Sequence, residues 1–161
     1  MKQAFLSLLF FTATAVTPWF SEVGQACTIG EEMGAQLPFG AIDISNADRL
    51  KIANLVFEAR KWPAVEIQAV VIAGAYKSER KIEWLKEVRG ENVKAYLLML
   101  GIKGGNILID KKTFTDAMTE RAADGSLIVE QVVVSLTPLC DGSCAWMCSD
   151  PRVTPHTRLI Q

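Results

Sequence analysis

The chain alternates between segments whose apolar residues repeat as they do in strands and segments whose apolar residues repeat as they do in helices. Strand-like runs, β-branched or alternating, cover residues 37–45, 65–76, 106–109 and 126–136. The run 65–76 alternates at first and then becomes wholly apolar, which is typical of a strand buried on both faces, so we expect it at the centre of the sheet. Pro138 is expected to end the last strand, because proline has no backbone N–H to offer a sheet.

Two amphipathic segments between these strands predict helices, at residues 47–61 and 78–100. Ser45 and Asn46 are both suitable N-caps for the first helix, and Gly101 is a suitable C-cap for the second. The residues expected to face the core share helical spacing: Leu50, Ala53, Leu55 and Phe57 in the first helix, and Ile82, Leu85, Val88 or Arg89, Val93, Tyr96, Leu97 and Leu100 in the second.

The order of these elements is β-α-β-α-β-β. It predicts an α/β (α+β) two-layer sandwich, with two helices packed on one face of a four-stranded mixed sheet. Residues 27–36 show no periodicity and are interpreted as an N-terminal leader. The polar segment 111–124 could hold a short helical piece, and residues 139–161 form a cysteine-rich C-terminal tail.

Residues 1–26 are interpreted as a signal peptide that directs export to the periplasm. Lys2 supplies the positive charge, residues 4–16 are almost unbroken apolar sequence, and Gly24-Gln25-Ala26 offers small residues for cleavage. A membrane anchor is disfavoured because the apolar stretch is shorter than the ~20 residues that a span needs, and we expect no transmembrane span after cleavage. An outer-membrane lipoprotein modified at Cys27 is disfavoured by Gly24, which stands where such sites usually have leucine.

Export makes all four cysteines candidates for disulfides, because exported proteins meet an oxidising environment: Cys27, Cys140, Cys144 and Cys148. Four cysteines allow three connectivities. The three cysteines of the tail cannot all pair among themselves, so we expect Cys27 to bond to one of them. A metal site is disfavoured, because zinc-binding cysteine pairs usually have a tighter spacing and the histidine His156 is distant from the last cysteine.

Composition and charge restrict the classes of function. With 161 residues, 50% of them hydrophobic, and a formal net charge of −1, the chain suits one globular domain. Nucleic acid and anionic lipid are disfavoured as partners, because both would require a basic surface. No catalytic set of residues and no phosphate-binding loop stands out, so we expect neither enzymatic activity nor a cofactor.

One stretch has a more specific pattern. The run 65–76 passes Gly74 and leads into a helix with Leu-Lys-Glu-Val-Arg-Gly-Glu-Asn-Val at 85–93, followed by Tyr96-Leu97 and Leu100-Gly101-Ile102. This order, together with the ending Val-Val-Val-Ser-Leu-Thr-Pro at 132–138, resembles OmpA-like domains, the peptidoglycan-tethering modules of the Gram-negative periplasm. The resemblance covers residues 37–138, and it implies the same β-α-β-α-β-β fold for that domain.

The resemblance also implies a ligand site. In the family, an aspartate after the second strand and an arginine in the second helix hold the diaminopimelate of a peptidoglycan stem peptide. Arginine suits the ligand's carboxylate because the guanidinium fork binds it bidentately. Arg89 matches the family's arginine, whereas Lys77 stands at the position of the aspartate. Glu79 or Glu83 could replace that acid and Tyr76 could line the pocket, so the candidates for binding the stem peptide are Arg89, Lys77, Tyr76 and Glu79.

Two other interpretations of these residues stay open. Arg89 could instead lie on the helix flank, paired with Glu87, Glu91 or solvent. The tail segment with Trp146 and Met147, both expected to be exposed, could be a disulfide-stapled cap or a protein-contact surface. We therefore expect an exported, non-catalytic cell-envelope module with a weakened peptidoglycan site. The alternative is a periplasmic interaction factor, such as an inhibitor or accessory subunit of an envelope or secretion complex.

Overall fold

The structure, a computed structural model, describes residues 27–154. The predicted signal peptide and His156 lie outside the described residues. The elements are, in chain order, β1 (Glu31–Ala35), α1 (Asn46–Ala59), β2 (Glu66–Tyr76), α2 (Ile82–Met99), η1 (Gly104–Asn106), β3 (Ile107–Phe114), η2 (Asp116–Met118), β4 (Glu120–Arg121), β5 (Leu127–Ile128), β6 (Val132–Leu139) and η3 (Ala145–Ser149), where η marks a short 3₁₀ helix.

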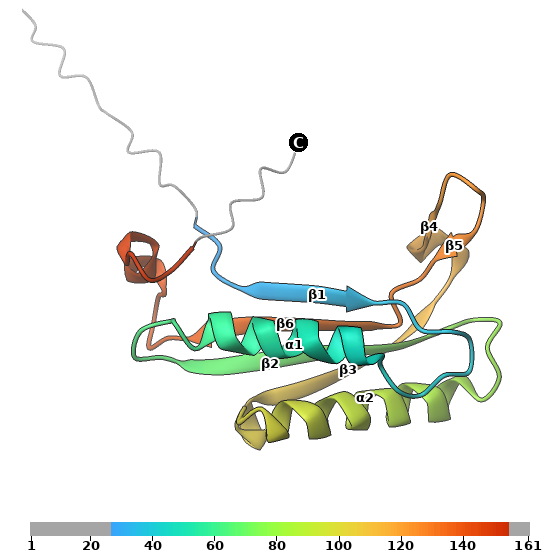
Figure 1. The fold of residues 1–161 in the computed structure, drawn as a ribbon, viewed down its shortest axis with the longest axis horizontal. Helices are drawn as coiled ribbons and strands as arrows, with labels where there is room; N and C mark the ends of the chain where they lie inside the picture. The colour runs from blue at the N-terminus through green and yellow to red at the C-terminus, as the bar shows by residue number, and fades with distance from the viewer. Residues whose placement is uncertain (1–26, 155–161) are drawn as a thin grey trace, which may run out of the picture.

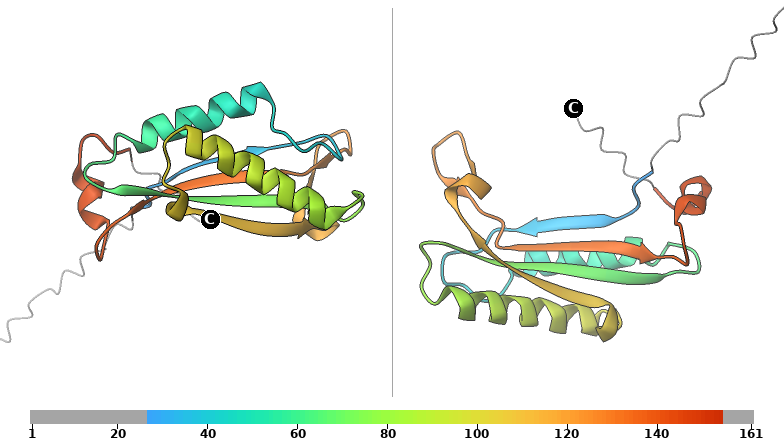
Figure 2. Two further views of the ribbon diagram at one scale, coloured as in Figure 1. Left: turned by 90° about the horizontal axis from the view of Figure 1, so that it is seen from below. Right: turned by 180° about the vertical axis from the view of Figure 1, so that it is seen from behind.

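Four strands form one mixed sheet in the order β1-β6-β2-β3 (Figure 1). β2 and β3 run parallel, because helix α2 carries the chain back between them, and the other neighbouring strands run antiparallel. Both helices cover the same face of the sheet, as Figure 2 shows from below. The predicted two-layer α/β architecture is therefore confirmed, with a small β4–β5 hairpin added before the last strand.

The core lies between the helices and one face of the sheet. Ala69, Val71 and Ala73 of β2 point into it and are fully buried, whereas Val70 and Ile72, on the other face of the same strand, are half-buried. The central position predicted for this strand is confirmed, but the prediction of burial on both faces is wrong. No helix of residues 27–154 covers the second face (Figure 2), which we call the open face of the sheet.

The first strand lies earlier than the sequence predicts. β1 falls inside the expected leader and pairs with β6, while residues 37–45, the predicted strand, form a loop with a turn at Gly40 (φ 79°). β1 has only five residues, and the acidic pair Glu31 and Glu32 hides the apolar alternation of Met33 and Ala35. The strand prediction for 37–45 is therefore wrong, and the leader contributes an edge strand.

Helix α1 begins where the sequence predicts, because the side-chain oxygen of Ser45 accepts a hydrogen bond from the backbone N–H of Asp48. Its predicted buried stripe is wrong, since Leu50 and Phe57 are each 63% exposed. Ile52, Val56 and Ala59 face the sheet instead. A short helix with apolar residues on two sides offers two possible stripes, and contact with β1 and β6 selects one of them.

Helix α2 is shorter at its start than predicted, and Gly101 ends it with a positive φ of 83°. β3 continues to Phe114, through residues expected to belong to a polar connection. The run 126–136 is divided between β5 and β6, and β6 continues through Pro138. Proline is tolerated there because the pairing of β1 with β6 ends at Leu136, so no neighbour needs the missing N–H on that side.

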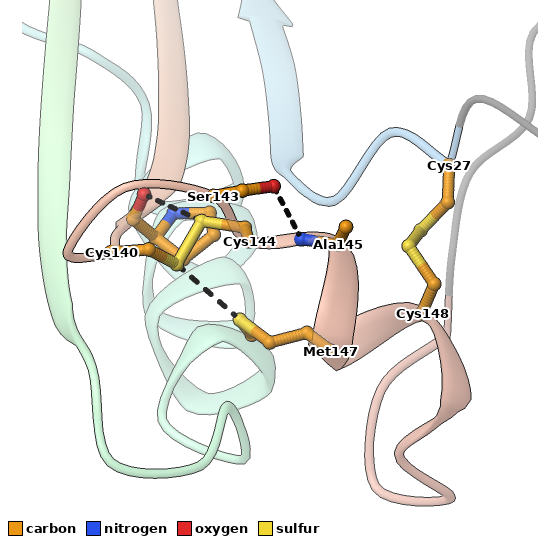
Figure 3. Close-up of a disulfide and its surroundings, with 8 residues drawn as sticks. Cys27, Cys140, Ser143, Cys144, Ala145, Met147 and Cys148 are labelled. Carbon is orange, nitrogen blue, oxygen red and sulfur yellow. Dashed lines mark hydrogen bonds between the residues drawn. A yellow bond between two sulfur atoms is a disulfide. The ribbon is translucent and has the colours of Figure 1, made fainter.

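The C-terminal segment contains two disulfides (Figure 3): Cys27–Cys148 joins it to the chain just before β1, and Cys140–Cys144 closes a short loop after β6. This pairing fits the expectation that Cys27 bonds to the tail. Met147 of η3 is fully buried in the core, so its predicted exposure is wrong, whereas Trp146 is 50% exposed. Burial of Met147 in the core supports the interpretation of this segment as a disulfide-stapled cap.

Candidate functional site

Arg89 lies on the face of α2 that packs on the sheet, and its side chain is completely buried. Its guanidinium makes four hydrogen bonds to acceptors of the same chain. Nε donates to the carbonyl oxygen of Ala41 at 2.8 Å, and Nη1 donates to the carbonyl oxygen of Gly74 at 2.7 Å. Nη1 and Nη2 also donate to the two carboxylate oxygens of Glu79, at 3.1 and 2.6 Å. Four of the five N–H donors of an arginine are thus used.

Glu79 reaches this arginine from the turn after β2, and its side chain is also completely buried. Besides the guanidinium, its carboxylate accepts hydrogen bonds from the backbone N–H groups of Gly40 at 2.9 Å and Tyr76 at 2.7 Å. Burial alone would raise the pKa of Glu79, but the bonds from Arg89 and from the two backbone N–H groups outweigh it and lower the pKa below its ordinary value. The carboxylate is therefore ionised at neutral pH.

The loop of residues 37–45 covers this ion pair. The ring of Phe39 stacks on that of Tyr76, with 5.6 Å between the ring centroids. Gln131, which is 1% exposed, accepts a hydrogen bond from the backbone N–H of Leu37 and donates one to its carbonyl oxygen. Together with the bonds from Gly40 to Glu79 and from Arg89 to Ala41, these contacts fix the first half of the loop over the ion pair.

Lys77 and the hydroxyl of Tyr76 are directed to a different carboxylate, that of Asp116 in η2. Lys77 Nζ lies 2.8 Å from Asp116 Oδ2, and the Tyr76 hydroxyl donates a hydrogen bond to Oδ1. Asp116 raises the pKa of both Lys77 and Tyr76, and Lys77, followed by Tyr76, lowers the pKa of Asp116. Lys77 thus belongs to an exposed ion pair and makes no contact with the buried one.

The structure therefore brings Arg89 and Glu79 together, with the backbone of Tyr76 as a third participant, and separates Lys77 from them. The interpretation of Arg89 as a surface residue is wrong. Glu87 pairs with Lys111 and Glu91 with Lys94 instead. The other acid considered, Glu83, pairs with Lys86.

Sequence reasoning missed the groups that complete the site, which are the carbonyl oxygens of Ala41 and Gly74 and the N–H of Gly40. Backbone atoms leave no signal in residue identity. Gln131 could have been recognised from the sequence. A polar residue inside a β-branched run indicates a buried amide with specific hydrogen-bond partners.

Within residues 27–154, no group of three or more His, Cys, Asp or Glu residues is arranged to hold a metal ion. Neither helix of this described part is long and apolar enough to cross a membrane.

Comparisons with known proteins give a likeness of fold. No family model matches the chain, and no curated protein matches it. Among solved structures, the OmpA-like domain of FopA1 from Francisella tularensis subsp. tularensis SCHU S4 is similar, with a TM-score of 0.49 and 12% sequence identity. The similarity covers 80% of this chain and 77% of that one. At this identity the likeness concerns overall fold alone and says nothing of a ligand.

Proposed function

We propose that this protein is an exported, non-catalytic module of the cell envelope that binds a protein partner, and that Arg89 is no longer available to a peptidoglycan stem peptide. The observation that carries the proposal is the position of Glu79. Its carboxylate occupies the guanidinium fork of Arg89 bidentately, with both side chains at 0% exposure.

A ligand carboxylate would have to displace that of Glu79 to reach the arginine. Glu79 would then lose its hydrogen bonds from Arg89, Gly40 and Tyr76. An ionised carboxylate left without partners in a buried place is strongly unfavourable, by several kcal/mol. An intramolecular carboxylate also holds its place at a high effective concentration, which a free ligand must exceed.

The position at which the family has an aspartate offers the stem peptide no favourable contact in place of Arg89. Lys77 stands there, and it would repel the ammonium group of diaminopimelate rather than accept from it. Its charge is already balanced by Asp116. The groups expected to bind the carboxylate and the ammonium of diaminopimelate are therefore both altered in this chain. This favours a periplasmic interaction factor over a weakened peptidoglycan-binding module.

Location in the envelope is part of the proposal. It is supported by the N-terminal sequence pattern and by the pairing of all four cysteines, since disulfides persist in oxidising compartments. Without the first 26 residues the chain is expected to be a periplasmic domain.

The test is cosedimentation with purified sacculi, using an OmpA-like domain with an intact aspartate and arginine as the positive control. The wild-type protein should stay in the supernatant, and Lys77→Asp should stay there too, because Glu79 still fills the fork of Arg89. In parallel, capture from periplasmic extract should yield a protein partner in stoichiometric amount. Sacculus binding by the wild type that free stem peptide competes away would overturn the proposal.

A further inference from the structure

The open face of the sheet and the β4–β5 hairpin enclose a groove of about 430 Å³. Its apolar lining comes from Ile72, Phe114, Met118, Ile128 and Val133. Ile72 on β2 and Val133 on β6 are paired neighbours, so they form a continuous floor. The hairpin stands beyond the end of β1 (Figure 1), and Glu120 of β4 and Ile128 of β5 also line the groove.

Two glycines of the sheet make room for the sides of this groove. A Cβ at Gly74 would lie 1.9 Å from the ring of Phe114, so the ring rests directly on the backbone of β2. A Cβ at Gly34 would lie 2.1 to 2.3 Å from the carboxyl group of Glu130, which rests on the backbone of β1 in the same way. An aromatic ring therefore bounds the floor on one side and a carboxylate on the other.

The carboxylates of the groove have no partners of their own. Among residues 27–154, Glu120 and Glu130 make no ion pair and no side-chain hydrogen bond, and both are exposed. Lys112 also lines the groove, but its Nζ lies 3.0 Å from Asp110 Oδ2 and its charge is balanced there. The groove thus combines an apolar floor with an uncompensated negative rim.

The apolar floor continues along the open face of the sheet. Val70 lies two residues before Ile72 on the same face of β2, and its register partner Leu108 on β3 is 51% exposed. This strip runs along the direction of the strands, from the groove towards Val70 and Leu108. It suits an extended chain, whose side chains repeat on one side at about 7 Å, twice the rise per residue of a strand.

From these features we infer a docking site for an extended segment of a partner protein in which apolar side chains alternate with lysine or arginine. In this arrangement the apolar side chains of the partner segment pack on Ile72, Val133 and Val70. Its lysine or arginine side chains pair with the carboxylates of Glu130 and Glu120. Long basic side chains suit this arrangement, because their aliphatic stems pack on apolar surface while their charged ends reach the rim. The inference rests on the proposed function as a protein-binding module, and it supplies the surface and the chemistry of the partner.

The probe is a short fluorescein-labelled peptide in which leucine and arginine alternate, with a matched peptide that has glutamate in place of arginine. Fluorescence anisotropy should show saturable binding of the basic peptide and none of the acidic one. Glu130→Lys should weaken binding about tenfold or more, because an attractive contact becomes repulsive. Asp141→Lys changes the net charge equally at an exposed position outside the groove and should leave binding unchanged.

The apolar floor is tested separately by Ile72→Thr, which keeps a β-branched residue on the strand and removes apolar surface. It should weaken binding of the basic peptide several-fold. The far-UV circular dichroism and unfolding midpoint of each variant serve as folding controls. Equal binding of both peptides, no binding at all, or equal losses in Glu130→Lys and Asp141→Lys would overturn the inference.

Two other outcomes separate this site from the proposed function. If the protein self-associates in sedimentation velocity and Glu130→Lys abolishes that association, the groove is an interface between copies of this chain, and the inference is wrong. If a periplasmic partner binds wild type and Glu130→Lys equally, the surface is wrong while the proposed function stands. Sacculus binding through Arg89 would contradict the proposed function and leave the peptide result unaffected.

Discussion

The carboxylate of Glu79 lies in the guanidinium fork of Arg89, with Nη2–Oε1 at 2.6 Å and Nη1–Oε2 at 3.1 Å, and neither side chain is exposed to solvent. This ion pair joins α2 to the turn after β2, and through Gly40 and Ala41 it joins both to the covering loop. An arginine that resembles a ligand-binding residue in sequence is thus a structural residue in the fold.

The first prediction concerns the contribution of this pair to stability. Glu79→Gln keeps the shape of the side chain but leaves the buried charge of Arg89 without its counter-ion. We expect the free energy of unfolding to fall by about 3 kcal/mol, since removal of one partner from a buried pair has costs of this size. Urea unfolding at pH 7 measures it.

Glu87→Gln is the matched control, because Glu87 forms an exposed pair with Lys111. Its loss should be below about 1 kcal/mol. Equal losses in the two variants would mean that the buried pair contributes no more than a surface one.

The second prediction concerns pH. The folded protein lowers the pKa of Glu79 below the 4.5 of an unperturbed glutamate, so the unfolded chain binds the proton more tightly than the folded one. The contribution of ionised Glu79 to the free energy of unfolding is therefore complete above pH ~5. It is lost as the pH falls below 4.5 towards the pKa of Glu79 in the folded protein. The difference in unfolding free energy between wild type and Glu79→Gln should shrink from pH 7 to pH 3.5. A difference that stays constant or grows would show that the carboxylate is not stabilised in its ionised form.

The element order and the central place of β2 could be predicted from periodicity, because a buried strand and a long amphipathic helix each leave a repeated signal. β1 could not, since a five-residue edge strand with Glu31 and Glu32 has too few inward positions to show alternation. The motif singles out Arg89 as a ligand-binding candidate, but its burial could not be predicted from the sequence. Its partner could not be predicted either, because the sequence suggests the nearby Glu87 and Glu91, whereas Glu79 reaches Arg89 only through the path of the turn after β2.

The third prediction concerns packing between α2 and the sheet. A Cβ at Gly90 would lie 2.7 Å from Ile109 Cγ2 and 3.2 Å from the Cβ of Ala73. Helix propensity alone would make Gly90→Ala stabilising by about 1 kcal/mol. We expect the opposite sign, a loss of about 1–2 kcal/mol, because the Cγ2 methyl of the β-branched Ile109 can move aside only by an unfavourable χ1 rotation or a shift of its strand.

Gly105→Ala tests the same change where a Cβ would meet nothing within 4 Å, and it should be close to neutral. The two variants are compared by their urea midpoints. A more stable Gly90→Ala protein would show that the helix can move away from β3 without loss of packing.

The fourth prediction compares the two disulfides. Cys27–Cys148 joins residues 121 positions apart, whereas Cys140–Cys144 joins residues four apart. In the chain-entropy model the long bridge contributes about 5 kcal/mol and the short one about 2 kcal/mol. Unfolding of Cys27→Ser/Cys148→Ser should therefore occur at a clearly lower urea concentration than unfolding of Cys140→Ser/Cys144→Ser. The reverse order would show that packing of Met147 beneath the short bridge outweighs restriction of the chain ends.

The fifth prediction follows the amide signals of Gly40 and Tyr76 in heteronuclear NMR spectra during titration with a diaminopimelate-containing stem peptide. Both amides donate to Glu79, so any ligand that displaced its carboxylate from Arg89 would move both signals. If Glu79 holds the fork of Arg89 as proposed, neither signal shifts in a saturable way at millimolar peptide. Saturable shifts of both signals, lost in variants of Arg89 that still fold, would contradict that account directly.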